Sequence, residues 1–214
     1  MSDFAQQRRM MVDCQLRTYD VTDPGVTAAM DTVPREAFVS DSTLAYLDRS
    51  VPMLPGSDRQ LMTPMVFARL IQAAEIVAGS KVLVVGAGTG YGAAVIADMG
   101  AVVTALECDP ALQQVAAERL AGSPVVLAKG PLEEGDKARA PYDVIVVEGA
   151  FEVEPDALLA QLADGGRLVG VKGSGRAASA TVYRKSGKTV GNRTITEAAA
   201  PILPGFAKRP AFVF

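Results

Sequence analysis

Short valine-rich runs alternate with segments of helical periodicity between Lys81 and Lys172, and this alternation constrains the fold more than any other feature of the chain. Parallel strands are buried on both faces and need helical connections, so they read as continuous apolar runs separated by helices. The expected strands are KVLVV, VVTALE, VVLA, YDVIVVE and GRLVGVK. Three helices are expected between them: one that begins near residue 91, one that begins at residues 109–110, and one over about 154–162. The pattern predicts an α/β fold with a mostly parallel, twisted sheet and helices on both faces.

The segment before this core has a different pattern. From about Ser2 to Val77, apolar residues recur at helical spacing and are interrupted by turn signals, which predicts a helical, loop-rich extension. Asp23–Pro24 and Thr63–Pro64 both have the pattern of an N-cap followed by proline at the first helical position. The second of these helices is expected to run to about residue 77 and to end at Gly79.

The segment after the core predicts an antiparallel hairpin at the sheet edge. Between Ala177 and Phe214, β-branched runs flank a turn at Ser186–Lys188, and a proline-rich tail follows. With 214 residues, of which 49% are apolar, the chain can bury one substantial core. We expect one domain in three parts: an N-terminal extension over 1–78, a core over 79–173, and C-terminal strands and tail over 174–214.

Composition excludes several classes of function. The formal net charge is −3 and no long basic run is present, which disfavours nucleic acid as the main partner. There is no histidine, and Cys14 and Cys108 are the only cysteines, so disulfide frameworks, histidine-based zinc sites and Ser-His or Cys-His catalysis are set aside. No apolar run approaches membrane-spanning length, and the charged, amphipathic N-terminus differs from a signal peptide. We expect a cytoplasmic monomer or weak dimer with no metal and no membrane contact.

A glycine-rich turn follows the first core strand in KVLVVGAGTGYGAAV, the stretch from Lys81 to Val95. Such a turn, placed between a buried strand and a helix, lets a ligand lie against bare backbone N–H groups. Glu107 ends the second core strand, 21 positions beyond Gly86, where a carboxylate can accept both hydroxyls of a ribose. Together these features predict a nucleoside ligand. The alternative is that the glycines only form a tight turn and Glu107 is a solvated strand end.

The spacing within the turn discriminates between nucleosides. In the dinucleotide fingerprint a third small residue stands three places after the second, and counting from Gly86 that position is Tyr91, which does not fit. Counting from Gly88 it is Ala93, which fits, but that frame starts late after the strand. The spacing G-x-G-x-G followed by tyrosine is typical of S-adenosylmethionine sites. A nicotinamide-dependent dehydrogenase stays as the less favoured alternative.

Several further motifs carry a resemblance over nearly the whole chain. They are MVDCQLR (Met11–Arg17), VPREAFV (Val33–Val39) with AYLD (Ala45–Asp48), TPMVFARL (Thr63–Leu70), VLVVGAGTGYGAAVIA (Val82–Ala97), Glu107, and ALLAQLADGGRLV (Ala157–Val169). With these motifs the sequence resembles the protein-L-isoaspartate O-methyltransferase family. VPREAFV is the most discriminating of them, because general methyltransferases lack it.

The resemblance implies the class I S-adenosylmethionine-dependent methyltransferase fold, which is Rossmann-like with a seven-stranded sheet. It implies transfer of a methyl group from S-adenosylmethionine to a carboxylate of isoaspartyl residues in damaged protein, yielding S-adenosylhomocysteine. The methyl ester then collapses to a succinimide that reopens partly to aspartate. The partner implied is a protein or peptide, and residues 1–78 would supply the acceptor side of the site. The cofactor residues implied are Gly86, Ala87, Gly88, Thr89, Gly90, Tyr91, Glu107, Cys108, Gly130, Pro131, Leu132 and Glu148.

The acceptor loop departs from the family pattern. Family members carry a GQTIS-like loop whose hydroxyls hold the isoaspartyl group, and the corresponding stretch here is DRQLMTP, Asp58–Pro64. Counting back from Pro64, the family serine falls at Met62, whose thioether donates no hydrogen bond. Thr63 is the candidate replacement for that hydroxyl, and a helix N-cap is its other interpretation. Met62 and Thr63 are therefore the candidate residues on the acceptor side.

Two positions on the cofactor side also depart from the pattern. Gly130–Pro131 stands where the family has Gly-Asp, whose carboxylate meets the adenine amine, and Glu133 or Glu134 is a candidate substitute. Glu148 begins a Glu-Gly-Ala stretch where the family has Thr-Ala-Ala. A carboxylate there can pair with the sulfonium or repel an anionic acceptor.

Three functional hypotheses follow. The first is isoaspartyl methyl transfer, the second is an S-adenosylmethionine-dependent methyltransferase with a changed acceptor, and the third is a non-catalytic S-adenosylmethionine-binding module. A run of basic residues near the C-terminus indicates either docking of an acidic peptide or surface, or a solvated hairpin. It comprises Lys172, Arg176, Arg184, Lys185, Lys188 and Arg193.

Overall fold

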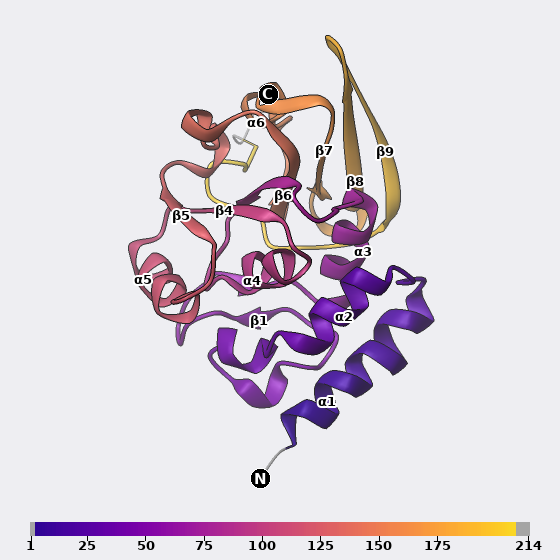
Figure 1. Ribbon diagram of the computed structural model, residues 1–214, viewed down its shortest axis with the longest axis vertical. Coiled ribbons are helices and arrows are strands. Elements are labelled where there is room, and N and C mark those ends of the chain that lie inside the picture. The colour runs from indigo at the N-terminus through magenta and orange to yellow at the C-terminus, as the bar shows by residue number, and fades with distance from the viewer. Residues whose placement is uncertain (1–2, 209–214) are drawn as a thin grey trace, which may run out of the picture.

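A seven-stranded sheet with the order β5-β4-β3-β6-β7-β8-β9 forms the centre of the computed structural model, which describes residues 3–208 (Figure 1). The strands from β5 to β7 in that order pair in parallel, and β8 and β9 are added antiparallel. The strands are β3 Lys81–Val85, β4 Val102–Glu107, β5 Val126–Lys129, β6 Tyr142–Phe151, β7 Leu162–Lys172, β8 Ser179–Ser186 and β9 Thr189–Glu197. The predicted α/β architecture with a mostly parallel sheet is confirmed.

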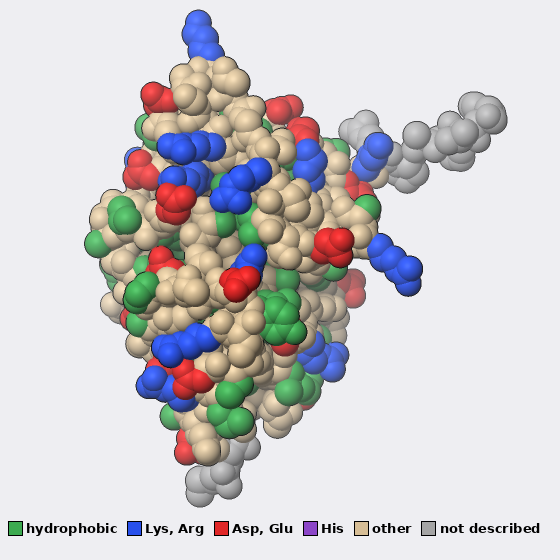
Figure 2. All heavy atoms as spheres, turned by 90° about the vertical axis from the view of Figure 1, so that its right-hand side faces the viewer, with side chains coloured by type: hydrophobic (Ala, Val, Ile, Leu, Met, Phe, Trp, Pro, Cys, Tyr) green, Lys and Arg blue, Asp and Glu red, His purple; other side chains and the backbone are tan. Residues whose placement is uncertain are grey.

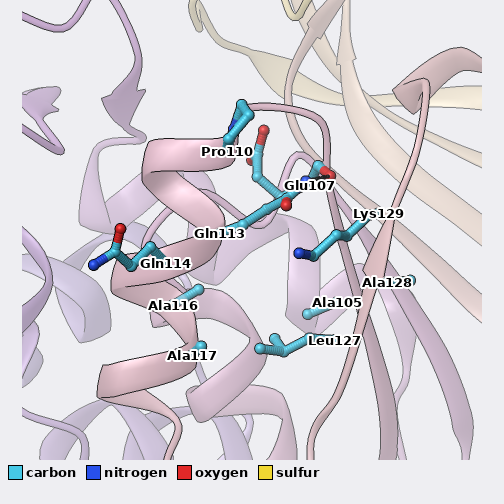
Figure 3. A pocket seen from close by; sticks show the side chains of 10 residues that line it. All are labelled: Ala105, Glu107, Pro110, Gln113, Gln114, Ala116, Ala117, Leu127, Ala128 and Lys129. Atoms are coloured by element: carbon cyan, nitrogen blue, oxygen red, sulfur yellow. Dashed lines mark hydrogen bonds between the residues drawn. The ribbon is translucent and has the colours of Figure 1, made fainter.

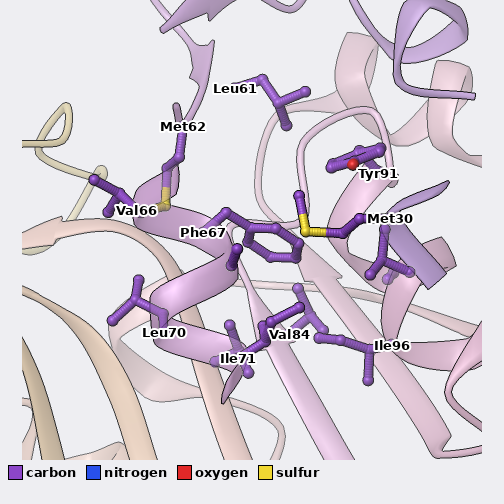
Figure 4. Packing of buried hydrophobic residues seen from close by; sticks show 14 of the residues in the cluster. Met30, Leu61, Met62, Val66, Phe67, Leu70, Ile71, Val84, Tyr91 and Ile96 are labelled. Carbon is purple, nitrogen blue, oxygen red and sulfur yellow. The ribbon is translucent and has the colours of Figure 1, made fainter. Parts of the chain in front are cut away.

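Alternate residues of β3 face two apolar clusters, one on each side of the sheet. Val82 and Val84 pack in the larger cluster, which helices α2 to α5 cover and which Figure 4 shows around Phe67. Leu83 and Val85 pack in the smaller cluster with the short helix α6. The helices are α2 Pro24–Thr32, α3 Pro64–Ala74, α4 Tyr91–Asp98, α5 Pro110–Arg119 and α6 Asp156–Ala160. Because β3 is buried on both faces, its sequence is apolar throughout, as parallel central strands require.

The predicted N-caps form where the sequence placed them. The Asp23 carboxylate accepts from the Val26 amide at 3.0 Å, and Thr63 Oγ1 accepts from the Val66 amide at 3.3 Å. In each case proline follows at the first helical position, where a missing N–H costs nothing. Helix α5 begins in the same way after Asp109.

Two helices in the structure have boundaries that differ from the predictions. Helix α3 ends at Ala74, because Glu75 adopts a left-handed backbone with φ 52° and its carboxylate binds Arg167 Nη2 at 2.5 Å. Ile76 is nonetheless buried, so the apolar spacing continues after the helix has ended. Helix α6 is shorter than expected, since β7 already starts at Leu162.

The N-terminal extension contains strands as well as helices, which the prediction of helices and loops missed. Helix α1, Phe4–Met11, continues into a π-helical turn over Val12–Leu16. Strands β1, Val51–Pro52, and β2, Gln60–Leu61, form a separate antiparallel pair. Two residues are too few to show the alternation by which a strand is recognised.

The C-terminal hairpin of β8 and β9 is confirmed, and the chain after it returns to the centre of the sheet. The amide of Ala150 in β6 donates to the Pro201 carbonyl at 2.8 Å, and the Leu203 amide donates to the Ala150 carbonyl at 3.0 Å. Residues 201–206, here called the C-terminal strap, therefore lie along the end of β6. Residues 209–214 of the predicted tail fall outside the described part of the chain. Among residues 3–208, no helix has both the length and the apolar character needed to cross a bilayer.

Candidate functional site

The carboxyl ends of β3, β4, β5 and β6 meet at one edge of the sheet, and the predicted cofactor residues lie there. The turn over residues 86–90 follows β3 and leads into α4, and Glu107 is the last residue of β4. Residues 130–132 follow β5, and Glu148 lies within β6. In open α/β sheets, ligands usually bind at this edge. The site lies where the strand order reverses, which here is on either side of β3.

Glu107 is the electrostatic centre of this edge, with only 2% of the residue exposed. Its Oε2 accepts from the Gly88 amide at 2.7 Å, and its Oε1 accepts from the amides of Cys108 at 2.8 Å and Asp109 at 3.0 Å. Arg59 adds a two-pronged contact, with Nη1 to Oε1 and Nη2 to Oε2 both at 2.9 Å. Burial alone would raise the pKa of Glu107, but these hydrogen bonds and the Arg59 charge outweigh it and hold the pKa below its usual value.

The chemistry of Glu107 fits a nucleoside. The two N–H groups of the Arg59 guanidinium donate side by side to the two oxygens of Glu107. The carboxylate is therefore oriented to accept a parallel pair of donors. The two hydroxyls of a ribose present such a pair. Three backbone N–H groups hold the carboxylate in place, and the Arg59 fork occupies its remaining face.

Side chains of the same chain pack against the glycine turn. Gly88 has φ +57°, and a Cβ there would collide with the Met53 side chain. A Cβ on Gly86, which has φ +75°, would stand 2.7 Å from Leu203 Cδ1 of the C-terminal strap. Both positions have the left-handed backbone that favours glycine, and the side chains of Met53 and Leu203 would have to shift to admit a Cβ.

Two predicted cofactor residues direct their side chains into the core instead. The Thr89 hydroxyl donates to the Phe38 carbonyl at 2.6 Å and is buried. Tyr91 is fully buried, with ring centroids 5.7 Å from those of both Phe38 and Phe67. Their side chains tie the VPREAFV block to the turn, while their backbone remains part of the turn.

A buried polar cluster underlies the site, formed by Arg35, Tyr91 and Glu148. Arg35 donates from Nε to the Ala45 carbonyl at 2.8 Å and from Nη2 to the Met62 carbonyl at 2.5 Å, and its guanidinium carbon lies 5.0 Å from the Tyr91 ring centroid. Arg35 Nη1, Tyr91 OH and Glu148 Oε1 have no hydrogen-bond partner within residues 3–208. Sequence reasoning did not single out Arg35 as a site residue. The available signal was a pair of charged residues, Arg35 and Glu36, within an otherwise apolar block.

Glu148 is held in an environment that disfavours its charge. Burial raises its pKa to about 8, although the positive charges of Arg35 and Arg59 lower it in part, and Glu107 raises it further. The carboxyl group packs against the bare Cα of Gly92 in the first turn of α4. At neutral pH this group is mainly uncharged.

Two cavities adjoin this edge of the sheet. One, of about 310 Å³, is lined by Asp58, Arg59, Gln60, Glu148 and the C-terminal strap, and we call it the acceptor cavity. The other, of about 320 Å³, lies between α5 and strands β4 and β5 (Figure 3). Gln113 borders it and donates to the Glu107 backbone carbonyl at 2.7 Å. Of the predicted cofactor residues, only Glu107 lines this second cavity.

The remaining predicted residues fall into two environments. Met62 is buried in the larger apolar cluster (Figure 4), while Thr63 Oγ1 caps helix α3. Leu132 is fully buried in the smaller cluster. Of the two candidate substitutes for the family aspartate, Glu134 pairs with Lys137 at the surface and Glu133 lies against Gly205 of the C-terminal strap.

The basic run of the sequence lies on strands β7 to β9 and the turns between them. Basic side chains gather over this part of the surface, with acidic side chains among them (Figure 2). Lys172 pairs with Glu154, and Lys185 donates to the Leu162 carbonyl at 2.7 Å. Two of the six basic residues are thus engaged within the molecule.

Comparisons with known proteins identify one family. The family model for "Protein-L-isoaspartate(D-aspartate) O-methyltransferase (PCMT)" matches residues 6–200. A relative from Rhodopseudomonas palustris, protein-L-isoaspartate O-methyltransferase 1, is 39% identical over 188 residues, covering 85% of this chain and 75% of the relative. Another, from Koribacter versatilis, is 38% identical and covers 86% of this chain and 85% of the relative.

Solved structures of the same name share the fold. One protein-L-isoaspartate O-methyltransferase superposes with a TM-score of 0.81 at 24% identity, over 92% of this chain and 66% of that one. A structure from Plasmodium falciparum, described as a putative member in complex with S-adenosyl-L-homocysteine, gives a TM-score of 0.77 at 17% identity, over 92% of this chain and 97% of that one. At these identities the likeness concerns the fold alone.

The raised pKa of Glu148 predicts a specific pH dependence of stability. The folded state holds one more proton than the unfolded state between the ordinary value of 4.5 and about 8, so the group's contribution to stability declines as pH rises through this window. Glu148→Gln is neutral throughout and should remove a slope of up to about 1.4 kcal/mol per pH unit. Thermal melts of both proteins from pH 5 to 9 measure this difference, with the exposed Glu118→Gln as control. Parallel curves for wild type and Glu148→Gln would show that Glu148 is ionised in the fold.

Proposed function

The chain belongs to the protein-L-isoaspartate(D-aspartate) O-methyltransferase family, and from that premise we propose that it methylates the carboxylates of isoaspartyl residues in damaged proteins, with S-adenosylmethionine as the donor. The observation that carries this proposal on the chain itself is Glu107, a buried carboxylate with two oxygens oriented toward a pair of donors. The match of the family model over residues 6–200 supports the acceptor class.

The reaction demands little acid–base chemistry from the protein. When bound, S-adenosylmethionine supplies a methyl group on a positively charged sulfur, which is a good leaving group. The acceptor carboxylate is already an anion at neutral pH, so no general base has to remove a proton. The protein's task is to bind, orient and exclude water, and proximity of this kind is worth about 7 to 11 kcal/mol. A chain without histidine can perform it.

On the donor side, Glu107 would accept the ribose hydroxyls, and the backbone of residues 86–90 would border the rest of the nucleoside. The Gly88 amide fixes the Glu107 carboxylate at 2.7 Å, so the turn and the acid act as one unit. The backbone of Cys108 and residues 130–132 completes the proposed cofactor side at the ends of β4 and β5. The side chain of Leu203 in the C-terminal strap packs against Gly86 of the glycine turn and would exclude water from the site.

On the acceptor side, Thr63 would take over the part of the family serine. A hydroxyl has one donor and two acceptor sites, and the bond from the Val66 amide uses only an acceptor site. The O–H proton therefore remains available for an acceptor carboxylate, and capping the helix does not compete with that role. Glu148, mainly neutral at pH 7, would not repel the acceptor.

Methyl transfer to a defined peptide tests the proposal. Purified protein, labelled donor and an isoaspartyl peptide should give labelled ester, while the matched aspartyl peptide stays unlabelled. Glu107→Ala removes the proposed ribose acceptor and should abolish most of the signal. Donor binding without any transfer to the isoaspartyl peptide would exclude this activity and favour a changed acceptor.

The role of Thr63 gives a separate prediction. Thr63→Ser keeps both the cap and the O–H and should retain activity. Thr63→Asp keeps the cap but has no O–H and adds a negative charge, so the melting temperature should hold while kcat/KM for the peptide falls about 10- to 100-fold, the loss expected for a hydrogen bond to a charged group. Steady-state kinetics at saturating donor provide the measurement. Equal kcat/KM for the two variants would assign Thr63 to capping alone.

A further inference from the structure

Arg59 occupies the position at Glu107 that a nucleoside would need. It lies in the chain segment that leads into β2, where the Met53 amide donates to the Arg59 carbonyl at 3.0 Å and the Arg59 amide donates to Ser57 Oγ at 3.1 Å. Its guanidinium reaches Glu107 over a separation of 48 residues in sequence. The side chain is 13% exposed and the Glu107 side chain 3% exposed, so the pair is shielded from water.

The Arg59 pair and a ribose cannot hold Glu107 together. A carboxylate offers about four lone-pair sites. Three are taken by the amides of Gly88, Cys108 and Asp109, and the Arg59 fork adds two more donors at 2.9 Å. Two hydroxyls on neighbouring ribose carbons need the same outward-facing positions as the fork. A nucleoside that binds Glu107 must therefore displace the guanidinium.

The displaced guanidinium has one evident destination. Arg59 lines the acceptor cavity, about 310 Å³ in volume, together with Glu148 and the C-terminal strap. Among the described residues that line this cavity, Arg59 alone is cationic, while Asp58 and Glu148 are acidic. An anionic acceptor entering the cavity needs a positive partner, and a guanidinium binds carboxylates through two parallel hydrogen bonds.

We propose that Arg59 is an exchanging side chain that holds Glu107 until a nucleoside displaces it and then binds the acceptor carboxylate in the acceptor cavity. This inference rests on the proposed function. It makes Arg59 a specificity-determining residue of the acceptor side, supplied by the loop that departs from the family pattern. It also imposes an order of binding, because the guanidinium becomes available to the acceptor only after the nucleoside has taken its place.

Calorimetric titration with S-adenosylhomocysteine tests the donor half of this proposal. Arg59→Met keeps a long apolar stem but removes the competing fork, so the variant should bind more tightly than wild type. If Arg59 holds Glu107 about nine-tenths of the time, its removal should raise the affinity for S-adenosylhomocysteine about tenfold. Arg59→Lys keeps a charge without the fork and should fall between the two. Arg69→Met is the matched control, since Arg69 pairs with the exposed Asp20 at 3.4 Å.

Kinetics with the isoaspartyl peptide test the acceptor half. At saturating donor, Arg59→Met should raise the KM for the peptide about tenfold or more, while Arg69→Met leaves it unchanged. Arg59→Met should therefore have opposite effects on the two ligands, with tighter binding of the nucleoside and weaker binding of the acceptor peptide. A residue that only supports the fold would shift neither constant in that way, and melting curves of both Arg59 variants check that they fold.

The possible failures are distinguishable. Weaker or unchanged nucleoside binding by both Arg59 variants would overturn the exchange, even if wild type methylates the peptide. Tighter nucleoside binding together with no methyl transfer by wild type would support the exchange at Glu107 and contradict the isoaspartyl acceptor. If no variant binds S-adenosylhomocysteine, both the exchange and the proposed function are wrong.

Discussion

The buried carboxylate of Glu107 is the contact on which the rest of the site depends. A charge removed from water is tolerated only when it is paired and fully hydrogen-bonded, and here three amides and one guanidinium meet that requirement. The sheet fixes the position of the Glu107 carboxylate relative to the glycine turn. Val85 and Leu106 are partners in the β3–β4 ladder, and the amides of Gly86 and Ala87 both donate to the Leu106 carbonyl at 3.0 Å. The turn after β3 and the acid after β4 are thus held in one register, and neither can move without the other.

The second constraint is the buried charge of Arg35 beneath the turn. By donating to the carbonyls of Ala45 and Met62, Arg35 ties together separate segments of the N-terminal extension, among them the loop that carries Arg59 and Thr63. Glu148 faces the same cluster from β6 and relieves its burial by remaining largely protonated at neutral pH. The polar contacts that fasten the extension to the core include those of the Thr89 hydroxyl with the Phe38 carbonyl and of Arg59 with Glu107, and apolar packing adds to them.

Sequence patterns predicted the parts of this structure that are governed by local rules. Continuous apolar runs identified the central strands, because β3 and β6 are buried on both faces, and Asp-Pro and Thr-Pro pairs located helix starts. The glycine turn and Glu107 were found because a fixed spacing links them. The assignment of residues to donor or acceptor stays a prediction.

What the sequence did not reveal depends on contacts between distant residues. The Arg59–Glu107 pair spans 48 positions, and no periodicity connects them. The C-terminal strap reaches Gly86 and β6 only because the hairpin of β8 and β9 returns the chain there. The end of α3 was misplaced because Ile76 is apolar and buried although it lies beyond the helix. In each case tertiary packing, rather than local propensity, decides the outcome.

The central claim is that Glu107 recognises the two hydroxyls of a ribose. Its most direct test is to compare the binding of S-adenosylhomocysteine and of its 2′,3′-dideoxy analogue to the wild-type protein by calorimetry. The account predicts that the analogue binds at least about tenfold more weakly, since two hydrogen bonds to a charged group are lost, and that Glu107→Ala removes the difference. Equal affinity of the wild-type protein for the two compounds would contradict it.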